Sequence, residues 1–317
     1  MNGVITMSKF GRLGRFGNQV FQYMFLADYA NRNNLELQLP PWVGNQLFTK
    51  QFKMVSAHRL PVRKELDETP GGTGIFPAER RQGIVHRNFD YEGYAQYYTG
   101  HYDCESKKYI KSLFEFQPEI VQRMAEPLAK LQGSGTAVTG VHLRRGDYGR
   151  GMFYITPVAW YLEVLEFLWS NLPNPVLFVS TESPELVREF ARFNPQTAES
   201  LGVDLRAKPL LNYNYLSHDL KQKDPRQLDW VPDWYLLRYC DKLLIPNSTF
   251  SFSAAMLRLG RSNGSDYQST LRTQPVSIRQ FHMINPWSAQ PLSYDKVEDY
   301  PELCAQGAKI DSNPYWK

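Results

Sequence analysis

The chain has 317 residues, of which 42% are hydrophobic and 21% are charged. These proportions are ordinary for a globular protein, and they exclude a disordered chain, a collagen-like chain and a coiled coil. The net charge of +4 is too small to indicate nucleic-acid binding, and the apolar runs are too short to span a bilayer core of about 30 Å. Three widely spaced cysteines argue against a disulfide framework and favour a reducing compartment: Cys104, Cys240 and Cys304.

The first half of the chain is predicted to be rich in loops. Apolar residues at helical spacing predict a helix over 17–32, and alternation over 35–39 predicts a short strand. The many Pro and Gly residues over 41–80 predict a mobile loop. A tyrosine-rich stretch, 89–102, is open to two interpretations, acceptor contact or first-domain core. A helix over 118–131 then ends at a Gly/Ser-rich break, which we interpret as the boundary between two domains, 1–134 and 135–317.

The second half is predicted to alternate strands with helices. Strands are predicted over 137–143, 176–180 and 242–245. Helix starts, each marked by a hydroxyl-bearing cap residue, are predicted at Thr156-Pro157, Ser183-Pro184 and Asn247-Ser248-Thr249. The last of these helices is expected to cover 250–259 and to end at Gly260. Such alternation predicts a parallel sheet whose ligands bind at the carboxyl ends of the strands.

Two adjacent arginines follow the first of these strands. Arg144 and Arg145 can form a fork for an anion, because guanidinium groups stay charged and offer several fixed donors to phosphate oxygens. Gly146 permits a tight turn, and Asp147 can hold an arginine in place. Taken alone, the motif is more typical of an ordinary surface loop with an ion pair.

A second motif, Asn247-Ser248-Thr249-Phe250, lies at a predicted helix start. Exposed amides at a helix N-terminus attract anions, although an ordinary N-cap is the commoner explanation. Because both motifs fall in the same half of the chain, a phosphate site and an ordinary surface remain equally open.

A glycine-rich segment near the N-terminus superficially resembles a dinucleotide-binding loop. Its glycines, Gly11, Gly14 and Gly17, have a spacing of three and three, and no long strand precedes them. An NAD site also requires an acidic residue at a strand end about 20 residues later, whereas Glu36 falls within a predicted strand. An NAD-dependent oxidoreductase is therefore a weak alternative. No Asp-x-Asp sequence occurs, so no metal-bridged nucleotide diphosphate and no other metal site is predicted.

Four blocks of sequence, taken in order, resemble the α1,2-fucosyltransferase family. They are Gly14–Tyr23, Gly100–Tyr109, His142–Tyr148, and Asn247–Ser251 with the preceding Asp233–Cys240. The same core resembles protein O-fucosyltransferases and α1,6-fucosyltransferases. The resemblance implies an α/β fold of the GT-B type, with two facing Rossmann-like domains that contain parallel sheets. Domain 1–134 would lie on the acceptor side and domain 135–317 would bind the donor nucleotide, while the last segment could pack back on the first domain.

The resemblance also implies the chemistry. The donor would be GDP-fucose, the acceptor a glycan ending in galactose, and the product an inverted α1,2 linkage, formed without metal or cofactor. By motif position, the catalytic residues would be Arg144, which contacts the β-phosphate, Arg145, and Asn18, which faces the reacting centre. Asp233 would accept from the guanine edge. The full set of implied donor-binding residues is His142, Asp233, Ser248, Thr249, Phe250, Gly17 and Glu182.

Two positions depart from the family pattern. Phe252-Ser253 stands where the family usually has Trp-Trp, and Thr181-Glu182-Ser183 replaces the usual paired acids. These changes keep open a protein that binds a nucleotide sugar without turnover, as well as a protein O-fucosyltransferase. We expect no nucleic-acid partner and no membrane span. The first ten residues also lack the pattern of a secretory signal, so we expect a cytoplasmic protein.

Overall fold

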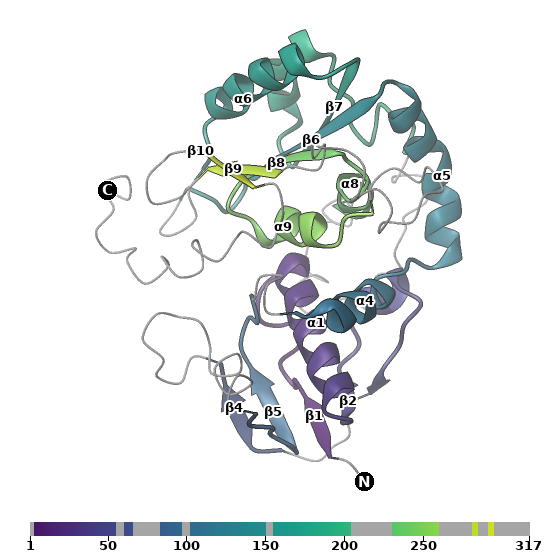
Figure 1. Ribbon diagram of the computed structural model, residues 1–317, viewed down its shortest axis with the longest axis vertical. Coiled ribbons are helices and arrows are strands. Elements are labelled where there is room, and N and C mark those ends of the chain that lie inside the picture. Colours follow the sequence, from purple (N-terminus) through teal and green to yellow (C-terminus); the bar gives the residue numbers. More distant parts are fainter. Residues whose placement is uncertain are drawn as a thin grey trace, which may run out of the picture. The chain divides into compact units, whose positions relative to one another are not determined.

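The computed structural model describes residues 3–54, 60–65, 83–96, 102–149, 155–203 and 230–259, together with the strands 281–284 and 291–294. The chain divides into two units, and the boundary between them falls after Val121, inside helix α5 (Pro118–Gly133). Each unit has its own sheet (Figure 1). The domain boundary predicted from the sequence, at 134/135, follows the end of this helix and stays a prediction.

The sheet of the first unit has the strand order β3-β2-β1-β5-β4, and every neighbouring pair is parallel. Ile5 of the central strand is in register with Leu37 on one side and Phe89 on the other, and all three side chains are buried. The strands are β1 (Val4–Thr6), β2 (Glu36–Leu39), β3 (Lys53–Met54), β4 (Val62–Lys64) and β5 (Phe89–Glu92).

Helix α1 (Phe16–Arg32) packs on this sheet, in contact with β1, β2 and helix α4 (Cys104–Leu113). Most of its side chains are buried. Burial of this apolar surface, and not intrinsic helix propensity, supplies most of the free energy that stabilises such a helix. Helix α4 begins where Asp103 accepts a hydrogen bond from the Ser106 amide. The predicted helix 17–32 and strand 35–39 are confirmed, and the predicted helix 118–131 corresponds to α5.

The prediction of a loop over 41–80 was wrong in part. Helix α2 (Gly44–Leu47) and the strands β3 and β4 fall within it, while the glycine run 69–74 lies outside the described residues. These elements are two to four residues long, too short to show a hydrophobic period. In the tyrosine-rich stretch, Tyr91 and Tyr102 are buried, which favours the core interpretation for both, whereas Tyr94 is exposed.

The sheet of the second unit has the strand order β10-β9-β8-β6-β7. Its strands pair in parallel except for the antiparallel pair β9–β10 at one edge. The strands are β6 (Ala137–Leu143), β7 (Pro175–Thr181), β8 (Lys242–Ile245), β9 (Phe281–Ile284) and β10 (Pro291–Tyr294). All residues of β6 are buried, as expected for a central strand covered on both faces. The predicted strands 137–143, 176–180 and 242–245 are confirmed.

Helices cover both faces of this second sheet (Figure 1). Helix α6 (Val158–Asn171) and the 3-10 helix η2 (Pro184–Phe193) pack on one face, and Leu165, Phe190 and Val141 share a buried core there. Helices α8 (Trp230–Leu237) and α9 (Thr249–Met256) contact each other, and they contact β7 and β8 respectively.

The observed helix starts differ from the predicted ones in the cap residue or in the type of helix. Pro157, with an extended backbone, occupies the N-cap of α6 in place of Thr156, whose side chain is buried. Ser183 occupies the N-cap of η2, which is a 3-10 helix and not an α-helix, and Ser248 occupies that of α9. None of these cap residues makes a side-chain capping bond. Helix α9 ends at Met256, before the predicted 259, and Gly260 lies outside the described residues.

Candidate functional site

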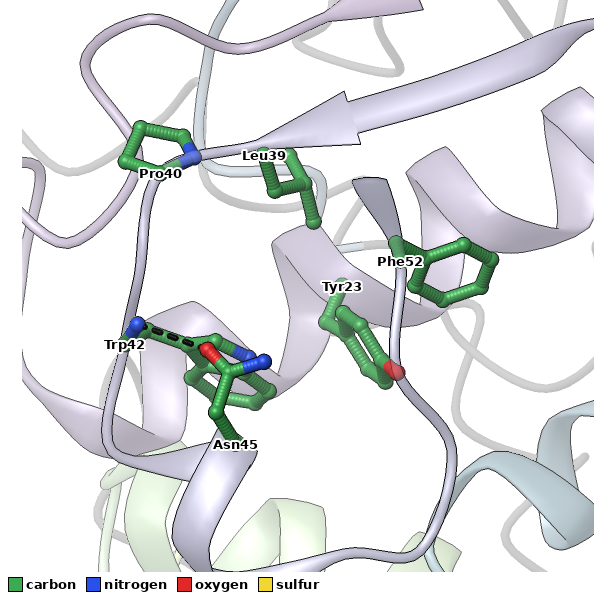
Figure 2. Close-up of a pocket in the computed structure, with 6 residues that line it drawn as sticks. All are labelled: Tyr23, Leu39, Pro40, Trp42, Asn45 and Phe52. Atoms are coloured by element: carbon green, nitrogen blue, oxygen red, sulfur yellow. Dashed lines mark hydrogen bonds between the residues drawn. The ribbon is translucent and has the colours of Figure 1, made fainter. Parts of the chain in front are cut away.

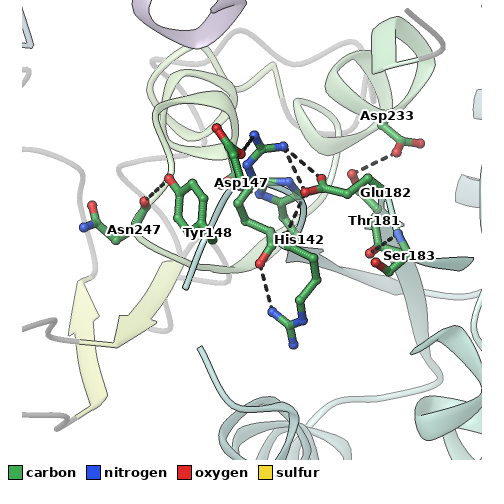
Figure 3. A network of polar contacts seen from close by, with 12 residues as sticks. His142, Asp147, Tyr148, Thr181, Glu182, Ser183, Asp233 and Asn247 are labelled. Atoms are coloured by element: carbon green, nitrogen blue, oxygen red, sulfur yellow. Dashed lines mark hydrogen bonds and ion pairs between the residues drawn. The ribbon is translucent and has the colours of Figure 1, made fainter. Parts of the chain in front are cut away.

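The charged site of the second unit follows from the pairing of β6 and β7. Leu143 is in register with Thr181 at the carboxyl ends of these parallel strands. The next residues of the two strands, Arg144 and Glu182, therefore lie side by side. Arg144 Nη1 donates to both carboxylate oxygens of Glu182, at 3.0 Å each (Figure 3). Glu182 Oε1 also accepts from the Arg145 backbone amide at 2.8 Å. One carboxylate therefore fixes both the guanidinium of Arg144 and the backbone that follows it.

The guanidinium of Arg144 has further partners on the loop after β6. Its Nη2 pairs with Asp147, as the sequence predicted, and its Cζ lies 5.2 Å from the centre of the Tyr148 ring. The Tyr148 hydroxyl donates to the Asn247 carbonyl at 2.6 Å, so this loop is tied to the loop that precedes α9. Arg144 is 17% exposed and Asp147 is 47% exposed, which leaves one side of the cluster open to solvent.

The tight turn predicted at Gly146 is confirmed. Its φ is +55°, in the left-handed region, and a Cβ added there would lie 2.9 Å from Glu182 Oε1. A larger residue would therefore strain the backbone and push against the carboxylate that holds Arg144. Glycine at this position lets Glu182 approach both arginines.

The two arginines and two carboxylates of the cluster balance in formal charge, but both carboxylates pair with the same arginine. Glu182 and Asp147 both pair with Arg144, while Arg145 donates through Nη1 to the Arg144 carbonyl at 2.9 Å. Among the residues that the structure describes, no carboxylate forms an ion pair with the Arg145 guanidinium. A phosphate entering this site would therefore find one guanidinium that is already compensated and a second that is not.

His142 lies inside the sheet, directly behind Arg144. Its Nδ1 is 2.8 Å from Ser251 Oγ, its carbonyl accepts from the Tyr161 hydroxyl at 3.0 Å, and its ring lies 5.1 Å from that of Phe250. Burial, and then the charges of Arg144 and Arg145, lower the pKa of His142 to about 3. The ring is therefore neutral at pH 7, and it can contribute hydrogen bonds but no charge.

Asp233 projects from α8 towards the end of β7. Its Oδ2 accepts from Ser180 Oγ at 2.9 Å, two residues before Glu182 (Figure 3). The rings of Trp230 and Phe250 meet edge-on at 6.1 Å, which links α8 to the start of α9. The residues predicted for this unit are thus gathered at the carboxyl end of one sheet: His142, Arg144, Arg145, Glu182, Asp233, Ser248, Thr249 and Phe250.

The glycine-rich segment of the first unit lies between β1 and α1. Gly11 and Gly14 have φ values of +81° and +77°. A Cβ at Gly14 would fall 2.1 Å from Asn18 Nδ2, so the amide of Asn18 packs directly on this glycine. Gly17 is buried in the first turn of α1. Asn18 Oδ1 accepts from Gln96 Nε2 at 2.8 Å, and Gln96 is a residue that the sequence did not single out.

The geometry of the first sheet disfavours a dinucleotide site. A strand, β1, does precede the glycines, but its three residues are too few for a sequence signal. Glu36 is the first residue of β2, so it lies at the amino end of the parallel strands, whereas the glycine segment follows the carboxyl end of β1. There Glu36 pairs with Lys53 and accepts from Gln38. No acidic side chain from this position can reach a ribose at the carboxyl end.

A small pocket lies beyond the carboxyl end of β2 (Figure 2). Trp42 and Tyr23 contribute nearly buried rings to it, and the Trp42 amide donates to Asn45 Oδ1 at 2.9 Å. Among the described residues, no charged side chain lines this pocket. The lining residues are Tyr23, Leu39, Pro40, Trp42, Asn45 and Phe52.

Two kinds of feature are absent from the part of the chain that the structure describes. No group of three or more His, Cys, Asp or Glu side chains there is placed to hold a metal ion. No helix there is both long enough and apolar enough to cross a membrane.

Comparisons with known proteins bear on the fold. Neither the protein-family models nor the curated proteins compared with this chain gave a match. Among solved structures, NodZ α1,6-fucosyltransferase soaked with GDP-fucose aligns with a TM-score of 0.55 at 13% identity, over 93% of this chain and 100% of that one. Fucosyltransferase NodZ from Bradyrhizobium gives 0.51 at 13%, and NodZ co-crystallised with GDP gives 0.51 at 14%; each covers 93% of this chain and 99% of NodZ. The chain therefore has the α/β, GT-B type fold of these fucosyltransferases, as the sequence predicted.

Proposed function

We propose that the protein is an inverting glycosyltransferase that moves L-fucose from GDP-fucose to a hydroxyl group of a glycan, without a metal ion. The shared fold with NodZ supports this proposal, since NodZ was solved with GDP-fucose and with GDP. The four sequence blocks favour an α1,2 linkage and a glycan acceptor ending in galactose. We further propose that the first unit carries the acceptor side and that the protein acts in the cytoplasm.

The observation that carries the proposal is the guanidinium of Arg144, held by Glu182 at the carboxyl end of β6. When the bond between fucose C1 and the phosphate oxygen breaks, negative charge develops on the leaving GDP. A fixed guanidinium stabilises that charge without reorganisation in the transition state. Loss of the leaving group gives the sugar oxocarbenium character, as in glycoside hydrolysis, which lowers the demand for a strong base.

The two carboxylates on Arg144 would act differently when the nucleotide arrives. The two bonds from Glu182 orient the guanidinium, whereas Asp147 is about half exposed. Exposed ion pairs contribute only about 0–1 kcal/mol, so a diphosphate can replace Asp147 at small cost. The guanidinium of Arg145 then supplies a second positive charge.

The remaining residues suit the other parts of the donor. The start of α9 offers backbone amides with the hydroxyls of Ser248 and Thr249 to the phosphates. Asp233, steadied by Ser180, suits a guanine edge, because N1 and N2 of guanine are both donors. His142 is neutral, and its hydrogen bond with Ser251 would support the start of α9 behind Arg144 without adding charge.

The proposal is tested by measuring release of GDP from GDP-fucose with a panel of galactose-terminated glycans. We expect Arg144→Ala to fold normally and to lose about 100-fold or more in kcat, since removing one donor to a developing anion typically has this effect. Arg188→Ala is the matched control, because Arg188 is an exposed arginine of the same unit, on η2. Near-wild-type turnover by a correctly folded Arg144→Ala protein would refute the proposed role.

A second candidate function is a nucleotide-sugar-binding protein without turnover. It is favoured by the carboxylates that already compensate Arg144. Calorimetric binding of GDP, without GDP release from GDP-fucose across the panel, would support this candidate. Including folded protein acceptors in the panel also separates glycan transfer from protein O-fucosylation.

A further inference from the structure

The segment after β5, Gly93–Gln96, has an unusual backbone. Ala95 is fully buried and has a φ of +52°, in the left-handed region that residues with a side chain rarely adopt. Backbone strain of this kind persists only where the surroundings impose it, and it is concentrated at functional sites.

Two buried side chains impose this conformation. Glu65 Oε2 accepts from the amides of Tyr94 at 2.6 Å and Ala95 at 3.0 Å. Gln22 Nε2 donates to the Gly93 carbonyl at 3.1 Å and to the Leu13 carbonyl at 3.0 Å, which joins this segment to the glycine-rich segment. A Cβ at Gly93 would fall 2.4 Å from Glu65 Oε2. These bonds therefore fix the backbone of residues 93–95, directly before Gln96.

The fixed segment places the side chain of Gln96 next to that of Asn18. Gln96 is exposed, and its Nε2 donates to Asn18 Oδ1 at 2.8 Å. A carboxamide has an accepting end and a donating end. Because Gln96 takes the oxygen, the Nδ2 end of Asn18 is left as the end that can contact a ligand, beside Gly14.

We propose that Gln96 is a positioning residue that orients Asn18 so that its Nδ2 donates to an oxygen atom of the bound substrates. This inference rests on the proposed function, and it makes Asn18 a donor and not the base. The substrate oxygen is a sugar hydroxyl of the acceptor, which accepts from an amide N–H.

A purely structural role for Gln96 does not account for this arrangement. The bonds that shape the segment come from the buried Glu65 and Gln22, whereas the bond between Gln96 and Asn18 is exposed to solvent. An exposed bond between neutral groups adds little to the free energy of unfolding. Its effect is expected in catalysis and not in stability.

The test is a double-mutant cycle between Gln96 and Asn18. Gln96→Glu keeps the shape of the side chain but removes the donor, so Asn18 turns its Nδ2 towards the new carboxylate and presents its oxygen to the substrate. We expect kcat to fall about tenfold while the melting temperature is unchanged. Gln96→Lys, which restores a donor, should recover part of this loss.

Gln51→Glu is the matched control, since Gln51 is an exposed glutamine of the same unit that also pairs with an asparagine, Asn45. It accepts from Asn45 Nδ2, and a glutamate keeps that bond while introducing the same charge. The glutamate loses the bonds from Gln51 Nε2 to the Asn45 and Phe48 carbonyls, which should lower the melting temperature and not kcat. We expect its kcat to stay within twofold of wild type. An equal loss in this control would mean that the added charge, and not the lost donor, causes the effect, and would overturn the inference.

In the Asn18→Ala background, Gln96→Glu should have no further effect on kcat. An undiminished tenfold loss there, or wild-type kcat in Asn18→Ala itself, would overturn the inference. In Gln96→Glu the KM for the acceptor should rise while the affinity for GDP stays the same. If the wild-type protein transfers no fucose, both proposals fail, whereas an active wild type with additive effects overturns the role of Gln96 alone.

Discussion

The polar residues at the carboxyl ends of the two sheets are organised in different ways. After β6 and β7, a guanidinium lies between two carboxylates, and the geometry comes from ion pairs among Arg144, Glu182 and Asp147. After β1 and β5, the candidate pair Asn18 and Gln96 is neutral, although Lys9 and Glu92 form an ion pair nearby. The geometry of this pair comes from the backbone, with glycines and Ala95 at positive φ. The first site should respond to charge, pH and salt, and the second to shape and to the direction of a hydrogen bond. Four sets of variants test this difference.

The largest effect is expected at Gly146, where a substitution would disturb both the backbone conformation and the carboxylate that pairs with Arg144. Gly146→Ala adds a Cβ at 2.9 Å from Glu182 Oε1 on a residue with a φ of +55°. We expect the affinity for GDP to fall about 100-fold, because Glu182 no longer holds both arginines, and the free energy of unfolding to fall by about 1–2 kcal/mol from backbone strain. Calorimetry and urea denaturation measure the two effects. Gly133→Ala, where a Cβ would meet nothing within 4 Å, is the control.

The second prediction concerns the backbone of the first unit. Glu65→Ala leaves the amides of Tyr94 and Ala95 without their acceptor, which should lower the free energy of unfolding by about 2 kcal/mol. Glu65→Gln keeps an accepting oxygen and should lose less than half of that amount. Urea denaturation of the three proteins measures this order, and equal losses in the two variants would mean that the carboxylate does not support the segment through hydrogen bonds.

The third prediction uses the lowered pKa of His142. Between about pH 3 and the ordinary value of 6.5, the unfolded chain binds a proton at this residue that the folded protein does not. Its contribution to stability is therefore complete above 6.5 and is lost as the pH falls towards 3. We expect the free energy of unfolding to drop by about 2 kcal/mol more in the wild type than in His142→Gln between pH 7 and pH 5. Parallel pH dependences in the two proteins would contradict the burial of a neutral imidazole.

The smallest effect separates the sites by their response to salt. Glu182→Gln should reduce kcat about fivefold at low ionic strength, and the ratio to wild type should shrink at 0.5 M salt, because charges near the surface are screened. Gln96→Ala acts through a neutral bond, so its ratio to wild type should stay constant. Steady-state kinetics at two salt concentrations measures both ratios, and a similar response of the two variants would erase the distinction between the sites.

The charged site could largely be anticipated from the sequence, and the amide site could not. A run of buried residues ending in two arginines marks Arg144 and Arg145 by residue type alone. What the sequence does not contain is the register of β6 and β7, which places Arg144 against Glu182. Tyr148 lies within the same motif, but its contacts with Arg144 and Asn247 depend on how the loop turns.

Gln96 has no signal of its own in the sequence. Its position depends on a left-handed alanine and on Glu65, a residue more than twenty positions earlier whose carboxylate binds backbone amides. Short elements were missed for a related reason. The three residues of β1 show no period, and α8 is apolar almost all round, so neither displays the alternation by which helices and strands are recognised.

The compensation of Arg144 by its own carboxylates has a consequence for selectivity. Arg144 already carries two counter-ions and exerts little long-range attraction of its own, so the attraction of an anion to this cluster comes from Arg145. Replacing the half-exposed Asp147 by the phosphate of a ligand costs little, so the pair with Asp147 does not itself select the ligand. If the proposed function holds, the contacts with the base and the sugar would therefore distinguish one anionic ligand from another.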